Sequence, residues 1–242
     1  RKRFGIEKNI DIIFKNTALV LSSFVAIILL GIILVVFFQS FESFSRYGLK
    51  FLVTSEWNPV KDEYGAFTAI YGTLVTSFLS LLITIPLGVG TAIFITEDFV
   101  PKVVREIIGS FVELLAAIPS VVLGLWAIFV MEPFFRAFFV FLHNFFGWIP
   151  LFSTEPTGRN SLLAILILVV MLLPIVTSIA RDSLNQVPKK LRNAAYGIGA
   201  SRWKTIFSVI LPAALSGIMA GVLLALGRAM GETMAVTMII GN

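Results

Sequence analysis

The chain has 242 residues, of which 57% are hydrophobic and 14% charged. Soluble proteins carry about a quarter charged residues, and the run 17–38 contains no charged residue over a length that suits a membrane. A soluble globular domain is therefore excluded, and we expect an all-α integral membrane protein. The chain also lacks cysteine, which excludes disulfides and thiol chemistry.

The N-terminal residues predict a cytoplasmic segment, because 1–15 contain the five basic residues Arg1, Lys2, Arg3, Lys8 and Lys15. No cleaved signal peptide is expected, because the chain does not open with a short apolar region and a cleavage site. The run 17–38 predicts the first transmembrane helix, and the charged stretch 39–65 predicts an external loop. We expect one region over residues 1–66 and a second, membrane-embedded domain over 67–242.

The second predicted span covers residues 68–95. It should kink near Pro86, because proline removes an amide donor and clashes with the preceding turn. A short polar connection over 96–106 follows. The third span is predicted over 107–131, where Glu113 must face protein, water or the membrane interface rather than lipid.

Residues 132–160 are rich in phenylalanine but contain Arg136 and His143. Treating 134–152 as a span would invert every later segment. The basic stretch 181–204 would then lie outside, against the usual excess of Lys and Arg in cytoplasmic loops. We therefore predict an interfacial or re-entrant helix in this region.

The fourth span is predicted over 161–180, a cytoplasmic loop over 181–204, and the last apolar run over 205–241. With the N-terminus inside, this arrangement has five spans and places 13 of the 19 Lys and Arg residues on the cytoplasmic side and five outside. The net charge of +5 is thus explained by membrane topology, and no nucleic-acid partner is expected. We expect a sixth helix beyond Asn242.

The stretch 187–204 combines basic and small side chains. Pro188 suits a helix N-terminus, and Gly199 is placed to end the helix. A short amphipathic helix is predicted from the spacing of Leu191, Ala194, Ala195 and Ile198. An ordinary basic membrane loop is one interpretation of this stretch. The other is a docking helix, because small side chains permit close approach to a partner.

The order Asn193-Ala194-Ala195, Gly199 and Val209-x-Leu211-Pro212 resembles the EAA loop of ABC importer permeases, EAA-x3-G-x9-I-x-L-P, without a gap. Asn193 stands where glutamate is usual, and Val209 where isoleucine is usual. The resemblance implies that this loop is the helix that couples the permease to its ATPase. The residues to which it assigns coupling are Asn193, Ala194, Ala195, Gly199, Leu211 and Pro212.

Small residues recur every four positions in the last apolar run: Ala213, Gly217, Gly221, Ala225, Ala229 and Thr233. A stripe of this kind permits close helix–helix approach in a membrane. Plain helix packing is one interpretation, and a seam beside a translocation path is the other.

Arg228 and Glu232 are four residues apart within apolar sequence, so we expect them to share a helical face, where they could pair. They could form only an intrahelical ion pair, or Arg228 could be an interfacial arginine. The alternative is an anion site, because a guanidinium presents several donors that suit phosphate-like oxygens. In that case Glu232 would hold the arginine in place.

The sequences GRAMGETMAV (227–236) and LLAAIPSVVLGLWAI (114–128) resemble permeases of the phosphate-specific ABC importer, the C-type (PstC-like) subunit above all. The resemblance implies a MetI-like type I importer fold, passage of inorganic phosphate, and roles for Arg228 and Glu232 in that passage. It also implies an ATPase subunit dimer, a paralogous permease subunit and an extracytoplasmic phosphate-binding protein as partners. The expected location is the lipid of a prokaryotic inner membrane, with a cytoplasmic N-terminus.

Three other functions are left open by the residues. The chain could be an ABC permease for another oxyanion such as sulfate or molybdate, an ion-coupled secondary transporter that uses Glu113 and Glu232, or a membrane scaffold that transports nothing. No catalytic triad, carboxylate pair or metal-ligand spacing is present in the sequence. We therefore expect no catalytic residues, no metal and no cofactor, and ATP hydrolysis on a separate subunit.

Overall fold

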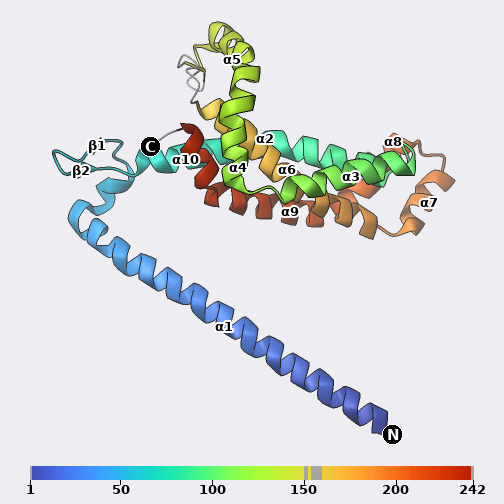
Figure 1. Ribbon diagram of the computed structural model, residues 1–242. Coiled ribbons are helices and arrows are strands. Elements are labelled where there is room, and N and C mark those ends of the chain that lie inside the picture. Colours follow the sequence, from blue (N-terminus) through green and yellow to red (C-terminus); the bar gives the residue numbers. More distant parts are fainter. Residues whose placement is uncertain (1, 150–151, 154–159, 241–242) are drawn as a thin grey trace. The chain divides into compact units, whose positions relative to one another are not determined.

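The computed structural model describes residues 2–149, 152–153 and 160–240, with side-chain surroundings from Asp11 onward (Figure 1). Its helices are α1 (Lys2–Tyr47), α2 (Phe67–Thr96), α3 (Lys102–Ala116), α4 (Ser120–Trp126), α5 (Glu132–Phe146), α6 (Ser161–Gln186), α7 (Lys189–Gly197), α8 (Arg202–Thr205), α9 (Leu211–Gly231) and α10 (Met234–Ile240). A 3-10 helix covers Gly48–Leu52, π-helical turns cover Ala127–Met131 and Ile206–Ile210, and β1 (Trp57–Asn58) pairs antiparallel with β2 (Glu63–Tyr64). The chain divides into two compact units, Arg1–Ile70 and Tyr71–Asn242.

The first unit consists of α1 and a small hairpin region. From Asp11 onward the side chains of α1 are exposed or half-exposed, which suits an apolar helix surrounded by hydrocarbon. Polar contacts stabilise the hairpin: Arg46 forms an ion pair with Asp62, and Tyr47 Oη donates to Asp62 Oδ1 over 3.2 Å. Trp57 packs edge-on against Tyr64 across the two strands, with ring centroids 5.0 Å apart.

The second unit is built around α6. Within its most apolar 18-residue window 61% of the residues are buried, against 17–33% for the other potential spans of this unit. Three apolar clusters pack on α6: one with α4, α5 and α10, one with α2 and the start of α9, and one with α2 and the remainder of α9. Helices α7 and α8 lie together at one end of this bundle and α4 and α10 at the other (Figure 1).

Five helical stretches in the described residues are long and apolar enough to cross a membrane: Asp11–Leu52, Phe67–Thr96, Ser120–Phe146, Ser161–Gln186 and Arg202–Gly231. The predicted bounds of the third span, 107–131, are wrong. Helix α3 ends at Ala116, and a new helix starts after Pro119, because proline lacks the N–H that would continue the helical hydrogen bonds. The aromatic segment that we predicted as interfacial or re-entrant continues this helix as far as Phe146. Of that predicted region, residues 150–151 and 154–159 lie outside the described residues.

Two π-helical turns lie just before Pro133 and Pro212, where the helical path continues through proline. One turn ends at Met131, two residues before Pro133, and the other at Ile210, two residues before Pro212. In each turn an N–H bonds the carbonyl five residues earlier: Glu132 to Ala127, and Leu211 to Ile206. Such a turn contains one extra residue, which moves away the carbonyl that the proline ring would otherwise meet.

The small-residue stripe of α9 packs mainly on α6, as the plain packing interpretation predicts. Gly217 lies against Ser183, and Gly221 against Ile179. Ala225 and Ala229 are buried in the cluster formed with α2 and α6. The two ends of the stripe, Ala213 and Thr233, are exposed, and Thr233 lies beyond the end of α9 at Gly231.

Candidate functional site

The predicted coupling segment, residues 187–204, folds as a helix, a turn and a second helix. Helix α7 starts after Pro188 and ends where Gly199 adopts a positive φ of 83°. The Gly199 N–H bonds Tyr196 O over 2.9 Å and the Ala200 N–H bonds Ala195 O over 3.0 Å, which is a Schellman motif. Ser201 then caps α8, and its side chain accepts from the Lys204 N–H. The predicted helix and its glycine end are both confirmed.

The predicted coupling residues occupy two different environments. Asn193, Ala194 and Gly199 are exposed, together with the large side chains Tyr196 and Ile198. A second set lies at the bundle: Ala195 is 5% exposed, Leu211 packs on the core cluster of α2 and α6, and Pro212 lies at the start of α9. The first set is available to a partner, and the second attaches the segment to the membrane helices.

Polar contacts also attach this segment to the connection between α2 and α3. Arg192 of α7 forms an ion pair with Glu97, which is 6% exposed. Arg202 of α8 donates to the Asp98 carbonyl over 2.9 Å. A cavity of about 470 Å³ lies here, and its walls include Lys189, Arg192, Arg202 and the two acids. The sequence did not indicate this contact, because Glu97 and Arg192 are 95 residues apart.

At the other end of α9, Arg228 and Glu232 do not share a helical face. Helix α9 ends at Gly231, and Glu232 has φ −79° and ψ 104°. The Glu232 carboxylate instead accepts from the Ala235 N–H over 3.2 Å, at the start of α10. The predicted helical pairing, in which Glu232 holds Arg228, is therefore wrong in this structure. The roles of both residues in translocation stay predictions.

Arg228 lies beside a small, otherwise apolar cavity of about 120 Å³. The cavity is lined by Leu115, Ala116, Ile118, Leu123, Met171 and Ile175 as well as Arg228. These residues come from both sides of the break between α3 and α4 and from the middle of α6. No ion pair to Arg228 occurs among the described residues, so its guanidinium can still take an anionic partner.

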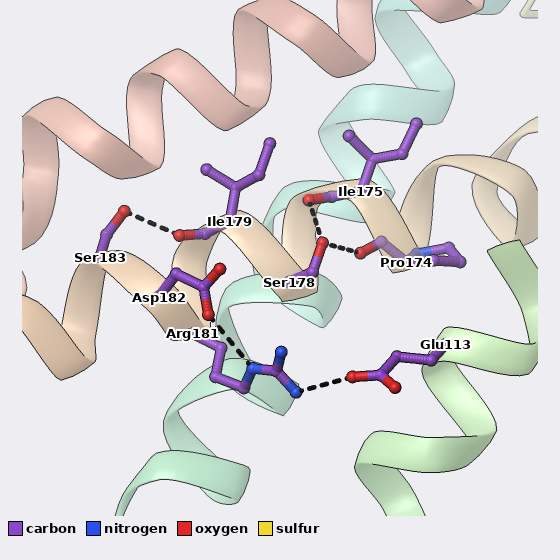
Figure 2. A network of polar contacts seen from close by, with 8 residues as sticks. All are labelled: Glu113, Pro174, Ile175, Ser178, Ile179, Arg181, Asp182 and Ser183. Carbon is purple, nitrogen blue, oxygen red and sulfur yellow. Dashed lines mark hydrogen bonds and ion pairs between the residues drawn. The ribbon is translucent and has the colours of Figure 1, made fainter. Parts of the chain in front are cut away.

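A second charged group lies further along the contact of α3 with α6. Arg181 Nη1 lies 3.2 Å from Glu113 Oε1, and Arg181 Nε lies 3.5 Å from Asp182 Oδ1 (Figure 2). A cavity of about 420 Å³ opens at this pair and is lined also by Lys102 and Arg105. Arg181 was predicted to begin a cytoplasmic loop, but α6 continues to Gln186 and includes it. Its position opposite Glu113 was not predicted.

Within the described residues, no group of three or more His, Cys, Asp or Glu side chains is placed to hold a metal ion. His143, the single histidine of the sequence, lies with Nδ1 2.7 Å from the Phe152 carbonyl oxygen. It therefore bonds the backbone of its own region.

Comparison with known proteins identifies the family. Residues 84–242 match the model of the binding-protein-dependent transport system inner membrane component. The phosphate transport system permease protein PstC of Pasteurella multocida is 41% identical over 214 residues, which are 86% of this chain and 67% of that protein. The PstC protein of Haemophilus influenzae is 40% identical over 239 residues, 96% of this chain and 75% of that protein.

A solved structure supports the fold. The inward-facing MetNI methionine ABC transporter aligns with a TM-score of 0.54 and 20% identity, covering 67% of this chain and 68% of that chain. At this identity the likeness concerns the fold alone, and it confirms the expected MetI-like permease architecture. The chain therefore belongs to the family of binding-protein-dependent transport system inner membrane components, in the group of the PstC permeases.

Proposed function

We propose that this chain is a permease subunit that passes inorganic phosphate through the inner membrane in an ATP-driven importer. As a member of its family it is a multi-pass inner-membrane component that works with an ATPase and a binding protein, and ATP is hydrolysed on the separate ATPase subunit. The observation that carries the proposal is that α9 joins an exposed coupling segment at one end to Arg228, beside an apolar cavity, at the other.

The coupling role is supported by the exposed face of α7. Lys189, Lys190, Asn193, Ala194 and Tyr196 are exposed on a helix whose ends are both fixed, by Pro188 and by the glycine turn. Movement of this helix passes along the chain through α8 and the π-helical turn into α9. A force applied by an ATPase at α7 would therefore reach Arg228, about 24 Å along α9 from Pro212 at 1.5 Å per residue.

The anion role is supported by the surroundings of Arg228. Arg228 is exposed beside an apolar cavity and has no ion pair among the described residues, so its guanidinium is able to bind a phosphate-like oxyanion. Ionisable residues within membrane helices commonly mark the path of a solute. The names of the 38–43% identical PstC relatives favour phosphate over other oxyanions.

We further propose the finer organisation of the importer. Two ATPase subunits would bind this chain and a paralogous permease subunit from the cytoplasm, and an extracytoplasmic phosphate-binding protein would deliver the solute. The N-terminus would be cytoplasmic, in accordance with the excess of Lys and Arg on that side.

Uptake of labelled phosphate into proteoliposomes tests the proposal. The assembled importer should accumulate phosphate only with ATP and the binding protein, and this chain alone should accumulate none. Unlabelled phosphate should compete, whereas sulfate and molybdate should not. Competition by those anions would make the chain a permease for another oxyanion. Uptake by the isolated chain would indicate a secondary transporter.

Arg228→Ala should strongly reduce phosphate uptake, because among the described residues no other cation lines the cavity. Loss of a charge-assisted hydrogen bond is worth about 1.5–3 kcal/mol, or roughly ten- to a hundredfold in uptake at low phosphate. Arg136→Ala is the matched control and should leave uptake unchanged, because Arg136 of α5 is exposed like Arg228 but does not line this cavity. Wild-type uptake by Arg228→Ala in a correctly assembled importer would contradict the role of Arg228.

A further inference from the structure

The connection between α2 and α3 is bound to the coupling segment by three successive residues. Glu97 forms its ion pair with Arg192 of α7. The Asp98 carbonyl accepts from Arg202 of α8. The Phe99 ring stacks on Trp203, with centroids 5.1 Å apart, and the Arg202 guanidinium lies 5.4 Å from the Phe99 ring centre. Both helices of the coupling segment therefore hold the same short connection.

Burial makes the Glu97–Arg192 pair costly to separate. The Glu97 side chain is 7% exposed and that of Arg192 is 19% exposed. Arg192 also donates to the Leu184 carbonyl over 3.4 Å. A buried carboxylate that loses its partner is strongly disfavoured, so the pair should stay closed when α7 moves.

Helix α3 extends this contact toward Arg228. At its start, Arg105 Nη1 lies 2.7 Å from Asp98 Oδ1, which attaches α3 to the same connection. Near its end, Glu113 pairs with Arg181 of α6, and the following Leu115 and Ala116 line the cavity beside Arg228. A displacement of the α2–α3 connection would therefore move one wall of that cavity.

We propose that the Glu97–Arg192 ion pair transmits movement of the coupling segment to α2 and α3, in addition to the movement that α9 receives through the chain itself. Displacement of α7 by the ATPase then moves α9 through the chain itself and α3 through this ion pair, so that Arg228 and the opposite cavity wall move in one step. This inference rests on the proposed contact of α7 with an ATPase. Glu97 and Arg192 are positioning residues, since neither lines the cavity beside Arg228.

The test is a double-mutant cycle in the complete importer, reconstituted with its binding protein. The variants are Glu97→Gln, Arg192→Gln and the two combined, and the measured quantity is ATP hydrolysed per phosphate taken up. Each single variant should raise this ratio about tenfold, the size of effect that coupling residues commonly have. The double variant should raise it no further, because residues that act as a pair are not additive.

Glu106→Gln is the matched control. Glu106 forms an exposed ion pair with Lys102, four residues earlier in α3, with Lys102 Nζ 3.5 Å from Glu106 Oε1. The same chemical change there should leave the ratio unchanged. ATPase bound per permease, measured by copurification, shows whether each variant assembles.

If a single variant fails to assemble, the test still stands. The double variant leaves no unpaired buried charge, so the ratio of ATP hydrolysed to phosphate taken up can be measured on it alone. An assembled double variant with the wild-type ratio overturns the inference, and so does a double effect equal to the product of the two single effects. The proposed function is judged separately, by whether the wild-type importer takes up phosphate. If it carries another oxyanion, the same ratio is measured with that solute.

Discussion

At the residue scale, two glycines of α9 set how closely it approaches α6. A Cβ added at Gly217 would lie 2.2 Å from Ser183 Oγ and 2.9 Å from Ser183 Cβ. The Ser183 hydroxyl donates to the Ile179 carbonyl over 2.7 Å (Figure 2), so rotating it away breaks that bond. At Gly221 the added atom would lie 2.9 Å from Ile179 Cγ2. Neither position has room for a methyl group.

Gly217→Ala should therefore destabilise the purified protein by about 1–3 kcal/mol, the usual effect of overpacking. Thermal unfolding in detergent, followed by the fluorescence of the four tryptophans, measures the change. Gly227→Ala on the same helix is the control, because nothing lies within 4 Å of the added atom. It should be neutral or stabilise by up to about 1 kcal/mol. Equal unfolding temperatures for the two variants would contradict the close contact.

Residue-level predictions succeeded where the local pattern decides and were wrong where a distant or competing contact decides. The four-residue spacing of small residues correctly predicted the face of α9 that packs. The same spacing placed Arg228 and Glu232 together, but the Ala235 N–H at the start of α10 takes the Glu232 carboxylate. Glu232 precedes the N-cap position of α10, which Thr233 occupies, so the sequence contained little sign of this competition.

At the element scale, the shape of the coupling segment depends on one left-handed residue. Gly199 has φ +83°, and the Schellman bonds at this turn direct the chain from α7 into α8. A side chain there is disfavoured by about 1–2 kcal/mol regardless of the surrounding space. The turn, rather than any contact of Gly199, fixes the angle between the two helices.

Gly199→Ala should reduce the amount of ATPase that copurifies with this chain about five- to thirtyfold at limiting ATPase concentration, if the strain acts entirely on the bound form. Gly90→Ala on α2, where the added atom meets open space, should not change it. If the same amount of ATPase copurifies with Gly199→Ala as with the wild type, ATPase binding does not depend on the geometry of this turn.

Helix existence was easier to predict than helix bounds. All five spans were expected from apolar runs, but the third was placed about a dozen residues too early because hydropathy continues across the break at Pro119. The charges of Lys102, Arg105, Glu106 and Glu113 mark α3 as amphipathic, which distinguishes it from the uncharged α4 that follows. The π-helical turns leave no signal in composition, apart from the prolines that follow them.

At the scale of the whole molecule, the distribution of charge predicts the orientation in the membrane. The predicted external loop contains Val60, which is 94% exposed, and the predicted cytoplasmic segment contains Ile198, which is 87% exposed. These 242 residues contain no cysteine, so a single thiol introduced among them reports on one position.

A membrane-impermeant maleimide added to intact spheroplasts should label Val60→Cys and not Ile198→Cys. Ile198→Cys should become reactive only after the membrane is opened, and bound ATPase should slow its labelling. The reverse pattern would overturn the predicted topology and place α7 on the side without ATP.

The whole-molecule prediction was limited by what a single chain contains. Within its own unit, the side chains of α1 from Asp11 onward are largely exposed. The predicted end of the last run at Gly241 lies outside the described residues, and α9 already stops at Gly231. Composition predicts that such helices enter a membrane and does not predict what they pack against.

The π-helical turn at Ile206–Ile210 also determines the angular phase of everything that follows it. Because an α-helix advances about 100° per residue, the one additional residue in this turn rotates α9 by that angle relative to α8. Deleting it would turn Gly217 and Gly221 away from α6 and carry Arg228 around the helix axis. The number of residues in this turn therefore sets the direction in which Arg228 points relative to the coupling segment. A related chain that lacks one residue in the turn would need an insertion of one residue before Arg228 to keep that direction.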